Sequence, residues 1–332
     1  MTKNITLAHG NGGEENNELI EGVFYKHLKN DYLKKSEDAS LIEGGRLAFT
    51  TDSFTISPLF FSGGDIGKLS ICGTCNDLAM MGAAPKYVTL AMMIEEGFSM
   101  KTLDKIVRSI KKELEVCGAV VVAGDTKVVP RGSVDKLFIN TSGVGVVEME
   151  GISASNLSVG DAIIVSRDIG AHGAAIYANR EGIDIQSTLK SDCASLWPMV
   201  KALKDAGIKP REMRDATRGG LAAVLNEWAK ASDVCIEIDE ALVPIAEEVK
   251  GICELLGFEP TALANEGTFV LALDPKDVDK AIEVLKTFEQ NEHCAFIGKV
   301  TDEYRQKVTL KSEWDTKRFL DMPTGELLPR IC

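Results

Sequence analysis

The sequence predicts an α/β (α+β) protein with two domains and a flexible C-terminal tail. Apolar runs typical of strands alternate with helical patterns in both halves of the chain. A stretch rich in Ser and Gly at 148–160 separates the halves, and the final residues contain prolines and show no hydrophobic period. With 332 residues, the chain is long enough to form two cores. We therefore expect domains at 1–150 and 151–321 and a tail at 322–332 that ends in Cys332.

The elements of the first half follow from local patterns. Apolar residues spaced by three or four predict a helix at 65–82, and Ser99 is placed to cap a second helix that Gly118 ends. Apolar runs predict four strands, the third of them short and buried, at 46–51, 86–95, 119–123 and 136–147. The second half continues the alternation, with elements at 161–166, 217–231, 268–273 and 275–288.

The charge of the chain limits its partners. Asp and Glu number 50 against 37 Lys and Arg, which gives a net charge of −13. Such a surface repels nucleic acid and anionic lipid, so we expect neither as a general partner. It also repels ATP, so a nucleotide site in this protein needs metal ions, backbone amides and a few placed cations.

Nothing in the sequence suggests a membrane or secreted protein. The N-terminus lacks an apolar signal core, and we find no run of about 18 apolar residues. The eight cysteines are scattered through apolar stretches, as is typical of reduced thiols. We therefore expect a cytoplasmic protein.

A glycine-rich segment at 9–13 is the first candidate binding element. Gly10, Gly12 and Gly13 lack Cβ atoms, so their backbone N–H groups can approach phosphate oxygens closely. The alternative is an ordinary N-terminal turn, and the segment alone does not decide between the two.

Three aspartates, Asp52, Asp77 and Asp125, lie at the ends of predicted elements. Mg²⁺ prefers carboxylate oxygens and usually keeps water and phosphate ligands. A single aspartate in such a place is more often a cap or turn residue. The repeated placement nevertheless favours a magnesium site that holds a triphosphate.

Two further segments carry candidate site residues. Arg218, Gly219 and Gly220 precede an apolar helix for which Thr217 is a plausible N-cap. The two arginines of the segment 214–220 suit an anion at a positive helix end, whereas the alternative is an exposed, capped turn. Glu266 precedes a predicted buried strand, where partial burial would raise the pKa of its carboxyl, as a general base requires. The residues alone favour an exposed turn for Glu266.

Two segments resemble known motifs but do not match them. Residues 62–69 resemble a P-loop, but Ser62 stands where Gly is needed, and Leu69 stands where Ser or Thr should bind Mg²⁺. Cys72 and Cys75 form a CxxC without a second pair at zinc spacing. Their helical, apolar surroundings favour core packing over redox activity.

A cysteine as the last residue is rare by chance. Pro329 stiffens the tail, and Arg330 supplies a cation that favours the nucleophilic thiolate of Cys332, although the α-carboxylate opposes it. The alternative is an unremarkable frayed end. At about 3.3 Å per residue, the ten residues from Pro323 onward span roughly 33 Å. The thiol can therefore reach both an internal cleft and a partner.

Taken in this order, the motifs resemble the HypE family of hydrogenase maturation factors, which are carbamoyl dehydratases. The resemblance covers essentially the whole chain, and the Pro-Arg-Ile-Cys end at 329–332 is its most specific part. Cys75 departs from the family pattern, in which we expect Ala. The aspartate-bearing segments are shared with aminoimidazole ribonucleotide synthetase and selenophosphate synthetase. The other matching segments are 9–13, 51–53, 67–69, 71–74, 76–77, 124–129, 215–220 and 265–267.

The resemblance implies a two-domain PurM-like fold, of the aminoimidazole ribonucleotide synthetase type. It implies a homodimer that pairs through the N-terminal sheets, with ATP and Mg²⁺ in a cleft at the interface. A partner, HypF, carbamoylates the terminal thiol. The enzyme then dehydrates the S-carbamoyl group to S-cyanide with ATP. The HypC–HypD complex accepts the cyano group for the iron of [NiFe]-hydrogenase.

The resemblance also implies roles for single residues. Cys332 carries the substrate, Glu266 is the expected base, and Lys127 stabilises the transferring phosphoryl group or the oxygen. The expected magnesium ligands are Asp52, Asp77 and Asp125. The expected nucleotide-binding residues are Gly10, Gly12, Gly13, Lys68, Asn76, Thr126, Arg218, Gly219 and Gly220.

Three alternatives stay open on the sequence. Selenophosphate synthetase shares the fold and the ATP site, but it should carry a reactive Cys or selenocysteine in the glycine-rich loop, and 9–13 has neither. A non-enzymatic adaptor would use the tail only as a docking peptide. A thiol oxidoreductase would depend on Cys72 and Cys75.

Overall fold

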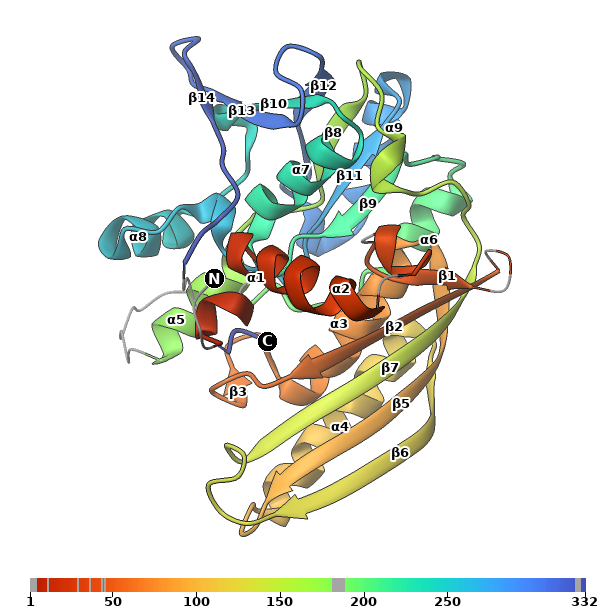
Figure 1. The fold of residues 1–332 in the computed structure, drawn as a ribbon, viewed down its shortest axis with the longest axis vertical. Helices are drawn as coiled ribbons and strands as arrows, with labels where there is room; N and C mark the ends of the chain where they lie inside the picture. The colour runs from red at the N-terminus through yellow and green to blue at the C-terminus, as the bar shows by residue number, and fades with distance from the viewer. Residues whose placement is uncertain are drawn as a thin grey trace.

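The computed structural model describes residues 5–10, 12–28, 30–35, 37–42, 44, 46–180, 189–325 and 330–332. These residues form two β-sheets with helices packed on them, and a small ribbon of β3 (Phe60–Phe61) and β4 (Gly64–Asp65). Figure 1 shows the five-stranded sheet below the seven-stranded sheet. In the described segments, no helix is long and apolar enough to cross a membrane.

The first sheet has the strand order β1-β2-β7-β5-β6. Its neighbouring strands are antiparallel, except for the parallel pair β5 and β6. Buried residues alternate with less buried ones along β7, so one face of the sheet packs inward. The strands are β1 Ser40–Ile42, β2 Leu47–Phe54, β5 Ala83–Glu95, β6 Val120–Val129 and β7 Leu137–Val147.

The helix α3 (Ile66–Met80) is the centre of the molecule. Asp65 caps it, because its carboxylate accepts the N–H groups of Gly67 and Lys68 at 2.7 and 3.1 Å. The helix is buried on nearly every side, as expected for a helix that contacts β2 and β7 of one sheet and β9 of the other. The helix predicted at 65–82 is confirmed.

The helix α4 (Met100–Cys117) packs beside α3. It begins at Ser99, whose hydroxyl accepts the N–H of Thr102 at 3.4 Å. It ends at Gly118, whose φ of 77° is the left-handed conformation that a helix C-cap requires. Both predicted ends of this helix are confirmed.

One strand differs from the prediction. The valine-rich run at 119–123 predicts a short buried strand, with Asp125 after its end. Instead, β6 continues to Val129 and is exposed along nearly its whole length, so Asp125 lies inside it. The reason is that β6 forms the edge of the sheet beside β5, where its valines face outward.

The second sheet has the order β14-β13-β10-β12-β8-β11-β9. Its central strands are covered on both faces, since Ile163 and Val165 of β8 pack with α7, whereas Ile164 packs with α6 and α9. The strands are β8 Ala162–Val165, β9 Glu212–Asp215, β10 Cys235–Asp239, β11 Phe269–Leu273, β12 Ala295–Thr301, β13 Lys307–Lys311 and β14 Lys317–Phe319. The helices are α5 Ala171–Arg180, α6 Trp197–Asp205, α7 Gly220–Ala231, α8 Glu247–Leu256 and α9 Val278–Leu285.

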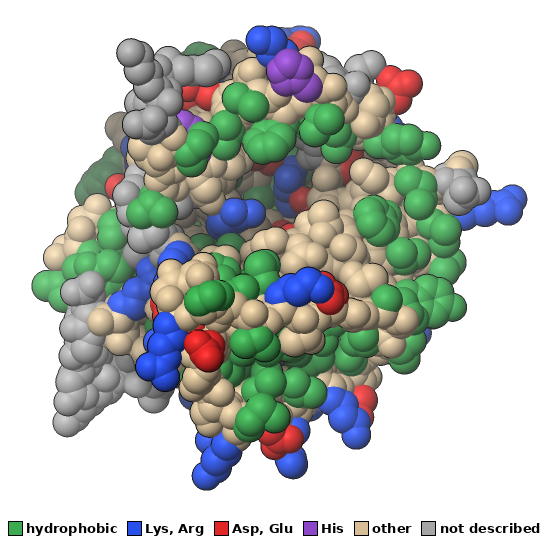
Figure 2. All heavy atoms as spheres, turned by 60° about the horizontal axis from the view of Figure 1, so that its bottom comes forward, with side chains coloured by type: hydrophobic (Ala, Val, Ile, Leu, Met, Phe, Trp, Pro, Cys, Tyr) green, Lys and Arg blue, Asp and Glu red, His purple; other side chains and the backbone are tan. Residues whose placement is uncertain are grey.

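The two ends of the chain meet near the junction of the sheets (Figure 1). The N–H of Glu14 donates to the carbonyl of Pro323 at 3.2 Å, and the Glu15 carboxylate accepts the N–H of Gly325 at 3.1 Å. The start of the N-terminal helical segment therefore holds the base of the tail. Figure 2 shows the molecule from below, hollowed near the centre of this view, with charged side chains visible in the hollow. The N-terminal segment contains α1 Glu14–Leu19, a π-helical turn Ile20–Tyr25 and α2 Lys26–Leu28.

Candidate functional site

Two of the predicted magnesium ligands lie near each other at the junction of the sheets. Asp52 on β2 accepts a hydrogen bond from Thr74 Oγ1 at 2.9 Å, and Asp77 on α3 accepts one from Thr50 Oγ1 at 2.7 Å. Burial and then the charge of Asp52 raise the pKa of Asp77 well above its ordinary value. Burial also raises the pKa of Asp52. Carboxylates brought this close together favour a bound cation.

The second domain adds a third carboxylate. Asp215, the last residue of β9, is 5% exposed, and its Oδ2 has no hydrogen-bond partner among the described residues. Burial and the charges of Asp38 and Asp52 raise the pKa of Asp215, against the lowering effect of Arg214. Asp215 belongs to the segment 215–220, in which the local pattern assigns it no role.

Arg218 connects this acidic group to the tail. Its guanidinium faces Cys332, Glu266 and Asp52, whose charges raise the pKa of Arg218 in that order. Its NH1 donates to the carbonyl of Gly10 at 2.9 Å, so Arg218 also contacts the glycine-rich segment. A predicted anion-binding residue thus lies between the acidic group and the end of the chain.

Glu266 is buried rather than part of an exposed turn. It is 2% exposed, and burial, then the charges of Cys193 and Asp215, raise the pKa of its carboxyl well above the ordinary value. The carboxylate of Asp192 holds this segment by accepting the N–H groups of Glu266 and Gly267, each at 3.0 Å. A buried carboxyl with a raised pKa has the property expected of a general base.

Cys332 lies inside the same site. Burial raises the pKa of its thiol to about 12, and the charge of Arg218 only partly offsets this effect. The docked thiol is therefore neutral near pH 7. Arg330, expected to favour the thiolate, instead donates to Asp135 and to the Thr55 carbonyl, both at 2.7 Å.

Several hydrogen bonds hold the end of the tail. The N–H of Thr55 donates to the backbone oxygen of Cys332 at 2.9 Å, and His172 Nε2 lies 2.8 Å from the Ile331 carbonyl oxygen. The Ile331 side chain is 5% exposed and belongs to the hydrophobic core around α3. Residues 330–332 of the expected flexible tail are thus docked, while Pro329 lies outside the described residues.

The glycine-rich segment packs against other parts of the chain. A Cβ on Gly12 would lie 2.9 Å from the Arg218 carbonyl oxygen, and one on Gly13 would lie 2.2 Å from the Pro323 carbonyl oxygen. The missing side chains let Arg218 and the base of the tail approach, which accounts for these glycines without a phosphate. Asn11 of the same motif lies outside the described residues.

Gly219 and Gly220 shape the start of α7. Gly219 is the N-cap with a φ of 81°, and Gly220 has a φ of 59° and would place a Cβ 2.5 Å from the Leu263 carbonyl oxygen. Thr217 is therefore not the N-cap, and its hydroxyl lies 3.5 Å from Asp215 Oδ1 instead. Because side chains are strained at both positions, only a tight glycine turn can present Arg218 to the site in this way.

The third predicted magnesium ligand, Asp125, lies on the exposed strand β6. Lys127 Nζ donates to Asp125 Oδ1 at 2.8 Å, which lowers the pKa of the Asp125 carboxyl. Thr126 between them is exposed as well. Within one chain, these three residues therefore lie on the open edge of the first sheet, whereas Asp52 and Asp77 lie at the junction of the two sheets.

Two predicted nucleotide-binding residues have partners within the protein. Lys68 Nζ donates to the carbonyl of Gly63 at 3.2 Å. Asn76 is 1% exposed, and its amide bonds the Ala194 carbonyl at 3.1 Å and the Leu196 N–H at 2.8 Å. Asn76 thus links the segment before α6 to α3. A role for Lys68 or Asn76 in binding ATP stays a prediction.

Three residues near the site, His172, Asp192 and Asp38, carry no signal in the sequence patterns. Each acts through a partner that is distant in the sequence, so no local spacing marks it. Asp38 pairs with Arg214 at 2.8 Å, and burial raises the pKa of Asp38 to about 7. The signal that identifies such residues is three-dimensional: a buried polar group with a polar neighbour from another element.

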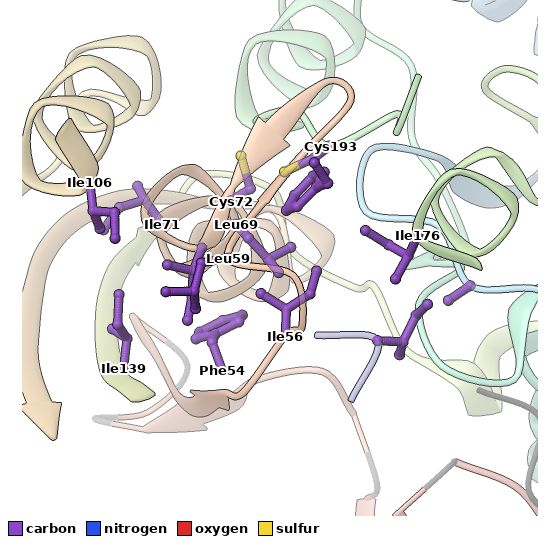
Figure 3. Close-up of a cluster of buried hydrophobic side chains, with 14 of the residues drawn as sticks. Phe54, Ile56, Leu59, Leu69, Ile71, Cys72, Ile106, Ile139, Ile176 and Cys193 are labelled. Carbon is purple, nitrogen blue, oxygen red and sulfur yellow. The ribbon is translucent and has the colours of Figure 1, made fainter. Parts of the chain in front are cut away.

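Cys72 and Cys75 face different partners. Cys75 Sγ lies 3.5 Å from Cys117 Sγ, and Figure 3 shows Cys72 next to Cys193, which comes from the second domain. Both CxxC residues are fully buried in the core around α3. Core packing is confirmed, because the two thiols do not face each other as a redox pair.

The junction of the two sheets offers part of a ligand set for magnesium. Asp52 and Asp77 supply carboxylate oxygens, and the buried Oδ2 of Asp215 lacks a partner within the described structure. No group of three or more His, Cys, Asp or Glu side chains in the described segments is arranged as a complete metal site. Since Mg²⁺ usually completes its shell with water and phosphate oxygens, these residues fit a magnesium ion that arrives with a nucleotide.

Comparison with known proteins assigns the family. The chain matches the AIR synthase related protein family twice, as its N-terminal domain at 36–147 and its C-terminal domain at 158–311. Carbamoyl dehydratase HypE of Escherichia coli (strain K12) is 44% identical over 338 residues, with 99% of each chain covered. The chain belongs to the HypE family. The predicted two-domain PurM-like fold is thereby confirmed.

Solved HypE structures agree with this assignment. A chain in the crystal structure of a HypE–HypF complex superposes with a TM-score of 0.87 at 44% identity, covering 92% of this chain and 99% of that one. A HypE structure in complex with ATP gives a TM-score of 0.83 at 39% identity, covering 99% and 100%. The resemblance read from the motifs is therefore confirmed along the whole chain.

Proposed function

We propose that this HypE-family protein is an ATP-dependent carbamoyl dehydratase that converts an S-carbamoyl group on Cys332 into an S-cyano group. The observation that carries the proposal is the position of Cys332, whose partly exposed thiol lies at one site with Arg218, Glu266 and Asp52. A substrate attached to the chain reaches this site without a bimolecular encounter, which raises its effective concentration. The relatives named carbamoyl dehydratase support this reading.

The proposed reaction removes one oxygen and two hydrogens from the carbamoyl group. The carbonyl oxygen attacks the γ-phosphorus of ATP, and ADP leaves. The C–O bond of the phosphorylated group then breaks while both N–H protons are removed, which yields S–C≡N and inorganic phosphate. ATP thus converts a poor leaving group into a good one.

Glu266 is the proposed base for one N–H proton, and the departing phosphate takes up the other. Burial raises the pKa of this carboxyl, which makes its carboxylate a stronger proton acceptor than that of an exposed glutamate. Arg218, which faces both Glu266 and Cys332, is placed to stabilise negative charge that develops on the carbamoyl oxygen. The site therefore combines a proton acceptor and a cation next to one sulfur atom.

We propose that ATP binds at the junction together with Mg²⁺ on Asp52 and Asp77. The HypE structure described as a complex with ATP supports nucleotide binding in this family. Bound Mg²⁺ would neutralise phosphate charge in a protein whose net charge of −13 repels a free nucleotide. The hydrogen bonds from Thr74 and Thr50 orient the two carboxylates for this purpose.

We propose a homodimer that pairs through β6 and completes the site. Val120 and Val128 are 55% and 68% exposed on this strand, and a second copy would cover them. Pairing at this edge would bring Asp125, Thr126 and Lys127 of one copy towards the nucleotide site of the other. Asp125 would then serve as the third magnesium ligand, and Lys127 would stabilise the transferring phosphoryl group.

Loading of the thiol requires the tail to leave the site. With a pKa of about 12 in the docked position, Cys332 is not a nucleophilic thiolate near neutral pH. We propose that HypF carbamoylates the undocked thiol and that the HypC–HypD complex later accepts the cyano group. The structure named as a HypE–HypF complex supports the first partner. The eight cysteines are free, in keeping with a reducing cytoplasm.

Mass spectrometry of the C-terminal peptide tests the proposal. After incubation with HypF and a carbamoyl donor, we expect the peptide that ends in Cys332 to gain a carbamoyl group. Addition of Mg·ATP should then remove one water from that group. A non-hydrolysable ATP analogue is the matched control and should leave the carbamoyl group intact. Loss of water without ATP would contradict the proposal.

A further inference from the structure

The carbonyl of Ile331 has a specific partner in the second domain. His172 on α5 is 0% exposed, and its Nε2 lies 2.8 Å from the Ile331 oxygen. Because a carbonyl oxygen can only accept a hydrogen bond, Nε2 must carry the proton. The buried histidine therefore donates to the backbone of the tail, one residue before the cysteine that carries the substrate.

Ser191 fixes this tautomer. His172 Nδ1 lies 2.8 Å from Ser191 Oγ, and the same oxygen accepts the N–H of Cys193 at 3.1 Å. In a neutral imidazole protonated at Nε2, Nδ1 has no proton and accepts the Ser191 hydroxyl, which is free to donate. Burial lowers the pKa of His172, which favours the same neutral form. The N–H at Nε2 thus points at the tail without an added charge.

The segment that fixes His172 also holds the proposed base. Asp192, next to Ser191, accepts the N–H groups of Glu266 and Gly267. The donor for the tail and the carboxyl of Glu266 are thus positioned by neighbouring residues of one segment. The position of the Cys332 sulfur relative to Glu266 therefore depends on the contact between His172 and the tail.

We infer that His172 is a positioning residue, which holds the docked tail by the Ile331 carbonyl and so sets Cys332 against Glu266. This inference rests on the proposed function, which it deepens. His172 contacts the backbone of the tail and is given no part in the chemistry. Thr55 binds the next backbone oxygen from the first domain, so both domains hold the end of the tail.

The first test measures docking rather than chemistry. The alkylation rate of Cys332 by iodoacetamide, followed by peptide mapping, reports how often the thiol is accessible. His172→Leu leaves the Ile331 carbonyl without its donor, so we expect alkylation to become about tenfold faster. His172→Gln retains an amide N–H and should restore most of the protection.

Ser195→Ala is the matched control. Ser195 lies in the same segment, is 5% exposed, and has a hydroxyl without a hydrogen-bond partner in the described part of the chain. Its removal should leave the alkylation rate of Cys332 unchanged. Ser191→Ala removes the hydroxyl that fixes the tautomer, and it should increase the rate in the same direction as His172→Leu, but less.

A second test separates positioning from a purely structural role. The loss of thermal stability caused by His172→Leu is measured in the full chain and in a chain that lacks Ile331 and Cys332. If His172 acts through the tail, the loss is smaller in the shortened chain. If His172 only fills space, His172→Leu lowers the thermal stability by the same amount in both chains.

The outcomes distinguish this inference from the proposed function. If alkylation is unchanged by His172→Leu, or if wild-type Cys332 reacts as fast as in a free peptide of the same sequence, the inference is overturned and the dehydratase proposal stands. If His172→Leu accelerates alkylation but carbamoylated wild-type protein never loses water with Mg·ATP, the proposed function is overturned and the docking role stands.

Discussion

The N–H of Thr55 donates a 2.9 Å hydrogen bond to the backbone oxygen of Cys332, although the two residues are 277 positions apart. Thr55 follows directly after β2, the strand that carries Asp52. The strand that supplies a proposed magnesium ligand therefore leads straight to the residue that receives the end of the tail. One stretch of backbone therefore connects the proposed nucleotide site to the docked end of the tail.

Two glycines added after Cys332 should slow dehydration at least about tenfold. The added residues would start from the terminal carboxyl group whose oxygen Thr55 binds, beside a partly buried thiol, so docking would require displacing neighbours. Single-turnover mass spectrometry of the carbamoylated tail measures this rate. The same two glycines placed before Met1 are the control, and equal rates for both proteins would contradict the prediction.

Asp77→Asn and Asp125→Asn should each weaken Mg·ATP binding, as measured by calorimetry, and mixing the two variants should restore part of the activity. In the proposed dimer, each site takes Asp77 from one copy and Asp125 from the other. Half of the randomly mixed dimers then contain one intact site, so about a quarter of the wild-type activity should return. Asp77→Asn mixed with Asp52→Asn is the control, because both defects then fall within one copy's own set of ligands. No recovery in the first mixture would place Asp125 elsewhere.

Some structural signals in the sequence are local. The ends of α4 are set by Ser99 and Gly118 through contacts with the helix itself, and the sequence predicts both. The sequence predicts a short, buried strand at the start of β6, whereas β6 is longer and exposed. A run of valines suits a buried strand and an open sheet edge equally well, and only the strand order distinguishes the two.

The sequence predicts individual residues of the site but not how they are arranged in space. Asp77 meets Asp52 because α3 packs against β2, and that packing depends on the whole fold. Asp125 has the same local appearance, but its strand lies at the sheet edge. His172 carries no local signal, because its partner is a carbonyl 159 residues away. Distant backbone partners of this kind leave no periodic pattern in a sequence.

Glu266→Gln should retain ATP binding and fail to form the cyano group, because Gln cannot accept the N–H proton. In the wild type, the single-turnover rate should rise with pH through a value well above the ordinary Glu pKa of about 4.3. Another residue is the base if the wild-type rate instead rises near the ordinary Glu pKa, or if Glu266→Gln forms the cyano group normally.

The same carboxyl affects stability with a defined sign. A pKa that is raised by burial means that the folded protein binds this proton more tightly than the unfolded chain does. Its stabilising contribution is therefore present at low pH and is lost as the pH rises through the raised pKa. Gln cannot ionise, so the melting temperature of Glu266→Gln relative to wild type should increase with pH. If the difference in melting temperature does not change with pH, the pKa of the Glu266 carboxyl is not raised by burial.

Arg214→Ala should lower the free energy of unfolding by about 3–5 kcal/mol, because it leaves largely buried carboxylates without their cation. Arg214 binds Asp38 at 2.8 Å and Glu227 at 2.9 Å, and the Asp38 side chain is only 7% exposed. Chemical denaturation measures the change. Lys201→Ala is the control, since its partner Asp205 is 52% exposed and such pairs contribute at most about 1 kcal/mol. Equal losses in both variants would contradict the prediction.

Cys332→Ser should abolish carbamoylation while the protein still folds and docks its tail. The contacts that dock the end of the chain use the backbone oxygens of Ile331 and Cys332 and the side chain of Ile331, so they do not need the sulfur. Serine has nearly the same shape, but its alkoxide is far less accessible near neutral pH than a thiolate, so HypF should find no nucleophile on the undocked tail. The C-terminal peptide of the variant should therefore keep its unmodified mass, and calorimetry should find Mg·ATP affinity unchanged. If the tail were only a docking peptide, Cys332→Ser would still support partner function. A Cys332→Ser protein that matures hydrogenase normally in cells would therefore refute the chemistry proposed for this site.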